Sequence, residues 1–155
     1  FFARTFCEQE FAAHGLNIHW PQANLTRTLR RGMLRGLHWQ AEPMAEIKLI
    51  RCSAGAIWDV VVDVRPGSST FGRWEAHELR SDGVRQLYVP GGFAHGFQCL
   101  VDGSEVSYLM SAPFEPTLAR GIRWDDTALG IPWPVPDPLV SPRDAALPGW
   151  SALMV

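Results

Sequence analysis

The amino-acid sequence predicts one all-β domain, a sandwich or barrel of short strands, and three observations support this. Glycine and proline (14 and 12 residues) recur between short apolar runs throughout the chain. These runs follow one another at the short intervals typical of antiparallel sheets. No repeat, low-complexity tract or linker divides residues 1–155, so we expect a single domain with one sizeable core.

Seven strands are expected, and one of them shows the strand pattern most clearly. In Ala56–Val64, every second side chain from Trp58 to Val64 is apolar, and the side chains between them include Asp59 and Asp63. A period of two places the apolar set against a core and the two aspartates on a more polar side. In chain order, the expected strands are Met33–Trp39, Ile47–Cys52, Ala56–Val64, Gly72–Leu79, Arg85–Val89, Ala94–Leu100 and Glu105–Met110.

The two ends of the chain are expected to differ from this pattern. Thr5–Leu16 is the best helix candidate, because Gly15 lies near its C-terminal end. The segment after Pro132 is rich in proline, which predicts an irregular tail. Its Trp133 and Trp150 are large apolar side chains, so we expect the tail to pack back onto the domain.

Composition excludes several classes of function. The formal net charge of -2 offers no basic field for nucleic acid. Cys7, Cys52 and Cys99 are odd in number, show no CxxC spacing and lie in apolar contexts, which favours a reducing compartment and hence the cytoplasm. The sequence shows neither a secretory signal nor an apolar run long enough to span a membrane, so no membrane partner is expected.

The segment Leu34–Gln40 carries the strongest chemical signal. Its His38 lies ten residues before Lys48, the only lysine in a chain that otherwise uses arginine. An ammonium can stabilise a developing oxyanion, and an imidazole can exchange a proton near neutral pH. Together they suggest proton abstraction next to a carbonyl, with stabilisation of the enolate. The alternative is a solvated lysine beside a structural histidine.

The remaining histidines and tyrosines bear on a metal site and on a second proton donor. A small sandwich with histidines on its strands suggests a cupin-like jelly roll, a fold that often binds metal. Neither His38 nor His95 has a second histidine at ligand spacing, so no metal is predicted. Tyr108, in an expected strand, could donate a proton to a carbanion or could be a core tyrosine with its hydroxyl at the rim.

The chain resembles the dTDP-4-dehydrorhamnose 3,5-epimerases and related enzymes of dTDP-4-keto-6-deoxy sugars. The resemblance runs through nearly the whole chain in order, and many linked motifs are more specific than any one of them. The matching segments are Phe1-Phe2, Asn24–Thr28, Gly32–Gln40, Lys48–Arg51, Trp58–Arg65, Gly67–Gly72, Arg85–Pro90, Gly92–Phe97, Ile122–Asp126 and Leu129–Pro134.

The resemblance implies roles for four catalytic residues. His38 matches the family's base, and Asp144, in Ser141–Pro148, matches the carboxylate that orients it. Lys48 matches the lysine near the C4 oxygen of the sugar. Tyr108 matches the tyrosine on the opposite side of the sugar, so removal and return of the proton would occur on two faces.

The resemblance also implies the binding residues and the partners. Arg35 matches an arginine that grips the diphosphate, which suits its bidentate geometry, and His95 matches a second pocket histidine. The remaining substrate-binding positions are Gln22, Asn24 and Phe2. The implied partner is a dTDP-linked 4-keto-6-deoxy sugar, with no cofactor, and the implied assembly is a homodimer.

The chain departs from the family's pattern in three places. Ala112–Glu115 stands where a pair of tyrosines is common, and Arg4 replaces an acidic residue near the nucleotide. The family's usual first strand would precede Phe1, so an N-terminal piece is expected to be missing. These departures leave open an epimerase acting at C3 only. A nucleotide-sugar binding module without turnover and a metal-dependent cupin are the alternatives from other classes.

Overall fold

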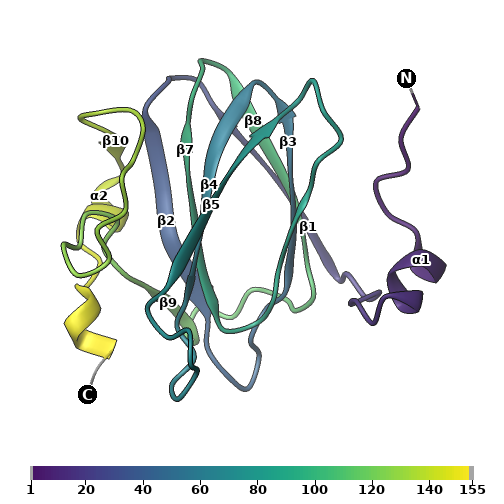
Figure 1. Cartoon of the computed structure of the whole chain (residues 1–155), viewed down its shortest axis with the longest axis horizontal. Helices are drawn as coiled ribbons and strands as arrows, with labels where there is room; N and C mark the ends of the chain where they lie inside the picture. The colour runs from purple at the N-terminus through teal and green to yellow at the C-terminus, as the bar shows by residue number, and fades with distance from the viewer. Residues whose placement is uncertain (1, 154–155) are drawn as a thin grey trace.

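The protein is a sandwich of two β-sheets, described for residues 2–153 in a computed structural model (Figure 1). One sheet has four strands in the order β1-β8-β3-β6, and the other has six, β10-β2-β7-β4-β5 with β9 paired to β2. This confirms the predicted cupin-like jelly roll. Phe1 of the Phe1-Phe2 motif lies outside the described residues. The strands are β1 Gln22–Thr28, β2 Met33–Gln40, β3 Lys48–Ala54, β4 Ala56–Asp63, β5 Trp74–Arg80, β6 Leu87–Val89, β7 Phe93–Cys99, β8 Ser104–Met110, β9 Ala119–Gly121 and β10 Leu139–Val140.

All seven predicted strands are present, with ends shifted by a few residues, but three further strands were missed. The longest of these is β1, an edge strand paired with β8. Gln22, Asn24 and Thr26 of β1 face a cavity between the sheets. Polar side chains on the inward face hide the apolar alternation by which a strand is recognised. The other two, β9 and β10, are too short to produce a periodic pattern.

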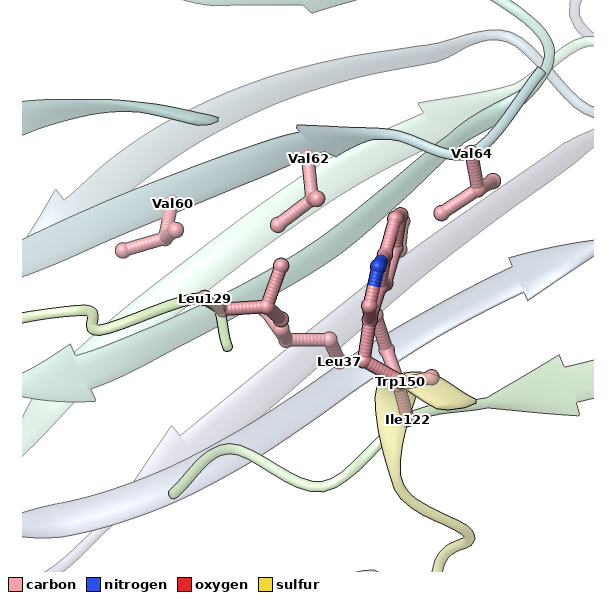
Figure 2. Close-up of a cluster of buried hydrophobic side chains, with 8 residues drawn as sticks. Leu37, Val60, Val62, Val64, Ile122, Leu129 and Trp150 are labelled. Carbon is pink, nitrogen blue, oxygen red and sulfur yellow. The ribbon is translucent and has the colours of Figure 1, made fainter. Parts of the chain in front are cut away.

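Strand β4 is buried on both faces, which corrects the expectation of a polar side. Ile57 packs in the core between the two sheets, together with residues of β3, β7 and β8. Val60 and Val62 belong to a second core on the outer face of their sheet (Figure 2). Asp59 and Asp63 are 0% and 1% exposed. Burial is possible because each aspartate has a basic partner, His95 and Arg65 respectively.

The C-terminal segment covers the outer face of the six-stranded sheet. Trp150 inserts among the valines of β4 in the outer core, as predicted (Figure 2). Trp133 packs against the same cluster, also as predicted. Gln98 fixes the segment by accepting from the Val135 N–H at 2.9 Å and donating to the Val135 carbonyl at 2.8 Å. The segment contains only short elements, β10, a helix α2 (Pro142–Ala145) and a 3-10 turn, joined by irregular chain.

The N-terminal helix is shorter than predicted. Helix α1 spans Glu8–Ala13. Cys7 before it has an extended backbone, with a φ of -146° and a ψ of 120°, and Gly15 follows its end with a φ of 68°. Figure 1 shows α1 and the C-terminal segment on opposite sides of the sandwich. No helix within residues 2–153 is both long enough and apolar enough to cross a membrane.

Candidate functional site

A cavity of about 470 Å³ lies between the two sheets and gathers most of the predicted site residues. One wall comes from β1, β3 and β8 of the four-stranded sheet, and the facing wall comes from β2 and β7 of the other sheet. Helix α2 contributes residues from the C-terminal segment. The predicted residues that line the cavity are Gln22, Asn24, Arg35, His38, Lys48, His95, Tyr108 and Asp144.

Phe2 differs from the other predicted site residues. Its side chain is 90% exposed, and Phe2 is not part of the cavity wall formed within residues 2–153. It belongs to the N-terminal segment that precedes α1. The structure therefore does not bring Phe2 together with the other residues, and its contact with substrate stays a prediction.

An irregularity in β2 directs two functional side chains into the cavity. In a regular strand, residues three apart point to opposite faces. Here the pairing of β2 with β7 shifts between Arg35 and His38, so both side chains line the cavity. The irregularity requires glycine at position 36. A side chain there would clash with β7, because its Cβ would lie 2.5 Å from the Cα of Gly96. The side chain of Leu37 turns outward into the outer core.

His38 is paired with Asp144 of helix α2. The His38 Nε2 lies 2.8 Å from Asp144 Oδ1, and the other carboxylate oxygen accepts from the Gly36 N–H at 3.3 Å. Ser141 caps α2 by accepting from the Asp144 N–H at 3.1 Å, and Pro142 occupies the first turn. The carboxylate is therefore fixed from both sides, and it holds the imidazole in one orientation.

The electrostatics of His38 favour the neutral imidazole at pH 7. Burial lowers the pKa of His38 below its ordinary value of 6.5, more than the nearby Asp144 carboxylate raises it. The charges of Lys48 and Arg143 lower this pKa further. With Nε2 bonded to Asp144, the other ring nitrogen is left to accept a proton, which a neutral imidazole does readily.

Lys48 lies at the start of β3 as part of the cavity wall. Its ammonium donates to the carbonyl oxygen of His38 at 3.3 Å, which ties it to the strand that carries the base. The same ammonium lies 2.7 Å from a carboxylate oxygen of Glu46. Sequence reasoning missed Glu46, although its position two residues before Lys48 places both side chains on one face of an extended chain.

Tyr108 reaches the cavity from the sheet opposite His38. It lies in the middle of β8, where it pairs with Asn24 of β1 on one side and Ile50 of β3 on the other. Central positions of this kind are held by two neighbouring strands, so the ring has a fixed place in the wall. His38 and Tyr108 therefore stand on facing sheets across one cavity.

His95, which lines the same cavity, forms a second histidine–aspartate pair with the buried Asp59 behind the cavity wall. The Nε2 of His95 lies 2.9 Å from Asp59 Oδ2. Asp59 Oδ1 is buried and has no hydrogen-bond partner in the described part of the chain. Sequence reasoning identified His95 but missed Asp59. The pairing of β4 with β7 brings these two side chains together, and spacing along the chain gives no sign of it.

Arginines supply positive charge to the cavity. Arg35 Nε is buried without a hydrogen-bond partner among residues 2–153, which leaves a charged donor for an anionic ligand. Arg120 and Arg143 also line the cavity, and sequence reasoning did not single them out. Within the same residues, no three His, Cys, Asp or Glu side chains gather in a metal-binding arrangement.

The segment that departs from the family's pattern belongs to the cavity wall. Phe114 lines the cavity, and its N–H donates to the side-chain oxygen of Gln22 at 3.0 Å. The next N–H, from Glu115, donates to the side-chain oxygen of Gln40 at 2.8 Å. Two glutamines of the site thus hold this segment in place, and Phe114 presents a ring without a hydroxyl.

Comparison with known proteins places the chain in one family. The model of the dTDP-4-dehydrorhamnose 3,5-epimerase family matches residues 1–152. A curated dTDP-4-dehydrorhamnose 3,5-epimerase from Sinorhizobium fredii is 41% identical over 156 residues, which cover 100% of this chain and 80% of the relative.

Solved structures of the same kind are similar in fold. The dTDP-4-dehydrorhamnose 3,5-epimerase of Bacillus anthracis, with TDP and PPi bound, aligns with a TM-score of 0.93 and 39% identity over 96% of this chain and 85% of that chain. ChmJ, a 3'-monoepimerase from Streptomyces bikiniensis in complex with dTDP-quinovose, aligns with a TM-score of 0.88 and 36% identity over 94% and 74%.

Proposed function

The chain belongs to the dTDP-4-dehydrorhamnose 3,5-epimerase family, and on that premise we propose that it inverts C3 and C5 of a dTDP-linked 4-keto-6-deoxy sugar. The observation that carries the proposal is the placement of His38 and Tyr108 on facing sheets of one cavity. Inversion of a carbon requires a proton to leave on one face and to return on the other. A base and an acid on opposite walls provide both steps.

The roles of the residues follow from the chemistry of the ketone. His38 removes the proton from the carbon next to the C4 ketone, and the electron pair of the broken C–H bond moves onto the C4 oxygen. The Lys48 ammonium stabilises this enolate. Tyr108 then donates its phenolic proton to the opposite face of the carbon. Solvent returns a proton to Tyr108 and takes one from His38 before the second carbon reacts.

The other cavity residues bind the substrate in this proposal. Arg35, with its unpartnered buried Nε, pairs with the diphosphate. His95 contacts the sugar, and Gln22 and Asn24 lie near the nucleotide. The substrate's own ketone acidifies C3 and C5, so these residues need no redox cofactor to abstract a proton.

A second candidate, inversion at C3 alone, is favoured by one observation. Phe114 replaces a hydroxyl-bearing ring in the cavity wall, and ChmJ, which is similar to this chain, is a 3'-monoepimerase. Loss of a hydroxyl at this wall removes a contact that could stabilise the sugar while C5 reacts. The double and single epimerases differ only in whether C5 exchanges its proton.

Proton NMR of dTDP-4-keto-6-deoxyglucose in deuterated water, with the purified protein, tests both candidates. Deuterium entering at C3 and C5 supports the double epimerase, and entry at C3 alone supports the second candidate. If neither carbon exchanges, the proposal is wrong, and saturation-transfer NMR with other nucleotides then tests for a binding module.

Replacing Tyr108 with phenylalanine tests the assignment of the acid. We expect Tyr108→Phe to retain some deuterium exchange, because His38 and Lys48 still form the enolate, but to lose net inversion by about a hundredfold or more. NMR measures the two rates in one sample. Parallel loss of exchange and inversion would contradict the assignment.

The arrangement of the whole protein completes the proposal. We infer that residues 1–155 act as one epimerase domain and that two copies form a homodimer, as the family resemblance implies. We also infer that the enzyme works in the cytoplasm, which suits three free cysteines. Light scattering coupled to size exclusion measures the mass of the assembly, and a monomeric mass contradicts the dimer.

A further inference from the structure

The ion pair between Glu46 and Lys48 is unusual because both charges are buried inside the reaction cavity. The side chains are only 7% and 8% exposed, and the two charged atoms lie 2.7 Å apart. Most paired carboxylates lie at the protein surface, where such pairs contribute little. A carboxylate buried against the one ammonium of the site therefore calls for an explanation in terms of the chemistry.

The backbone around the pair is fixed. Ile47, between the two residues, donates its N–H to the Ser111 hydroxyl at 2.8 Å, and its carbonyl accepts from the Ser111 N–H at 3.0 Å. With Ile47 anchored, the side chains before and after it extend to the same side. Glu46 and Lys48 both line the cavity as a result.

Two groups of the protein hold the ammonium in place. The Glu46 carboxylate lies on it, and the His38 carbonyl accepts one of its hydrogens at 3.3 Å. An ammonium on a flexible four-carbon stem has three donors and many rotamers, so contacts of this kind decide where the remaining donors point. The Glu46 carboxylate also places an opposite charge beside an ammonium that is largely removed from water.

We propose that Glu46 is a positioning residue of the epimerase, which holds the Lys48 ammonium in place and directed at the C4 oxygen of the sugar. The inference rests on the proposed function, since it assigns Lys48 the enolate. Glu46 acts through Lys48 and does not itself touch the reacting carbons. Its removal should therefore slow enolate formation while leaving the nucleotide-binding residues in place.

The test replaces Glu46 with glutamine, which keeps the shape and removes the charge. We expect kcat, expressed per dTDP-binding site counted by calorimetry, to fall roughly tenfold to a hundredfold while KM stays within about threefold. Glu46→Asp, which keeps the charge but shortens its reach, should lie between Glu46→Gln and the wild type. Glu78→Gln, at an exposed ion pair with Arg80 on β5, is the matched control and should match the wild type.

Counting binding sites separates positioning from a purely structural role. A structural role lowers the number of sites that bind dTDP and leaves the rate per site unchanged. A rate per site within about twofold of the wild type in Glu46→Gln overturns the inference. If Glu46→Gln does not fold, the rate per dTDP-binding site of Glu46→Asp is compared with that of the wild type, and a rate within about twofold overturns the inference. Failure of the wild type itself to exchange C3 and C5 protons would instead overturn the proposed function.

Discussion

Two histidine–aspartate pairs contribute their histidines to the cavity wall, and they differ in how much of the histidine is left accessible. The side chain of His38 is 38% exposed, whereas that of His95 is 11% exposed. The carboxylate of Asp144 uses both oxygens, on His38 and on the Gly36 N–H. Asp59 uses one oxygen on His95, and its other oxygen has no partner within residues 2–153.

The difference shows that the residue types alone do not make a base. A base needs an accessible ring nitrogen and a carboxylate that holds the ring in place, and the pair of His38 on β2 and Asp144 on α2 has both. His95 is enclosed between strands, and its carboxylate is fixed on one side only. We therefore assign proton transfer to His38 and substrate binding to His95.

The largest expected effect comes from removing each histidine in turn. His38→Ala should lower deuterium exchange at both C3 and C5 by about a thousandfold or more, because no other cavity side chain replaces the base. His95→Ala should retain exchange at saturating substrate and raise KM by roughly tenfold, as loss of one polar contact would. NMR exchange rates at several substrate concentrations measure both variants. Full epimerase activity in His38→Ala would mean that His38 is not the base.

A smaller effect is expected from neutralising the two aspartates. Asp144→Asn should lower kcat on the order of a hundredfold, since the neutral amide neither fixes the tautomer of the imidazole nor stabilises its charged form. Asp59→Asn should lower kcat by less than about tenfold, because His95 has no part in proton transfer in the proposed mechanism.

Steady-state kinetics distinguishes the two aspartate variants, and dTDP binding checks that both are folded. Equal losses of kcat would mean that both pairs take part in proton transfer. A larger loss in Asp59→Asn than in Asp144→Asn would mean that His95 is the base.

The two pairs also differ in how far the sequence could predict them. His38 and Lys48 were predicted from residue chemistry, because they lie ten residues apart in one apolar region. Asp144 lies 106 residues from His38, and only the family resemblance identified it. Asp59 was assigned to a polar face, since alternation in β4 cannot reveal a histidine on the neighbouring strand.

The strands of the fold also differ in how far the sequence could predict them. Strands with apolar alternation, such as β4, were predicted within a few residues. Strand β1 was missed because Gln22 and Asn24 lie on its inward face and line the cavity, where a core strand has apolar side chains. The packing of Trp150 was predicted from its size, but the helix that presents Asp144 was not, because a single turn leaves no periodic pattern.

The smallest expected effect concerns pH, and it tests whether His38 is the group that titrates. Burial holds the pKa of His38 below 6.5, and only the neutral imidazole accepts a proton, so kcat/KM should stay constant as the pH falls to 6.5 and decline below it. Asp144 raises this pKa, so Asp144→Asn should move the acid limb to still lower pH while it lowers the rate. A limb that moves in Asp59→Asn and stays in place in Asp144→Asn would assign the titration to His95, because each aspartate acts on the imidazole that it contacts.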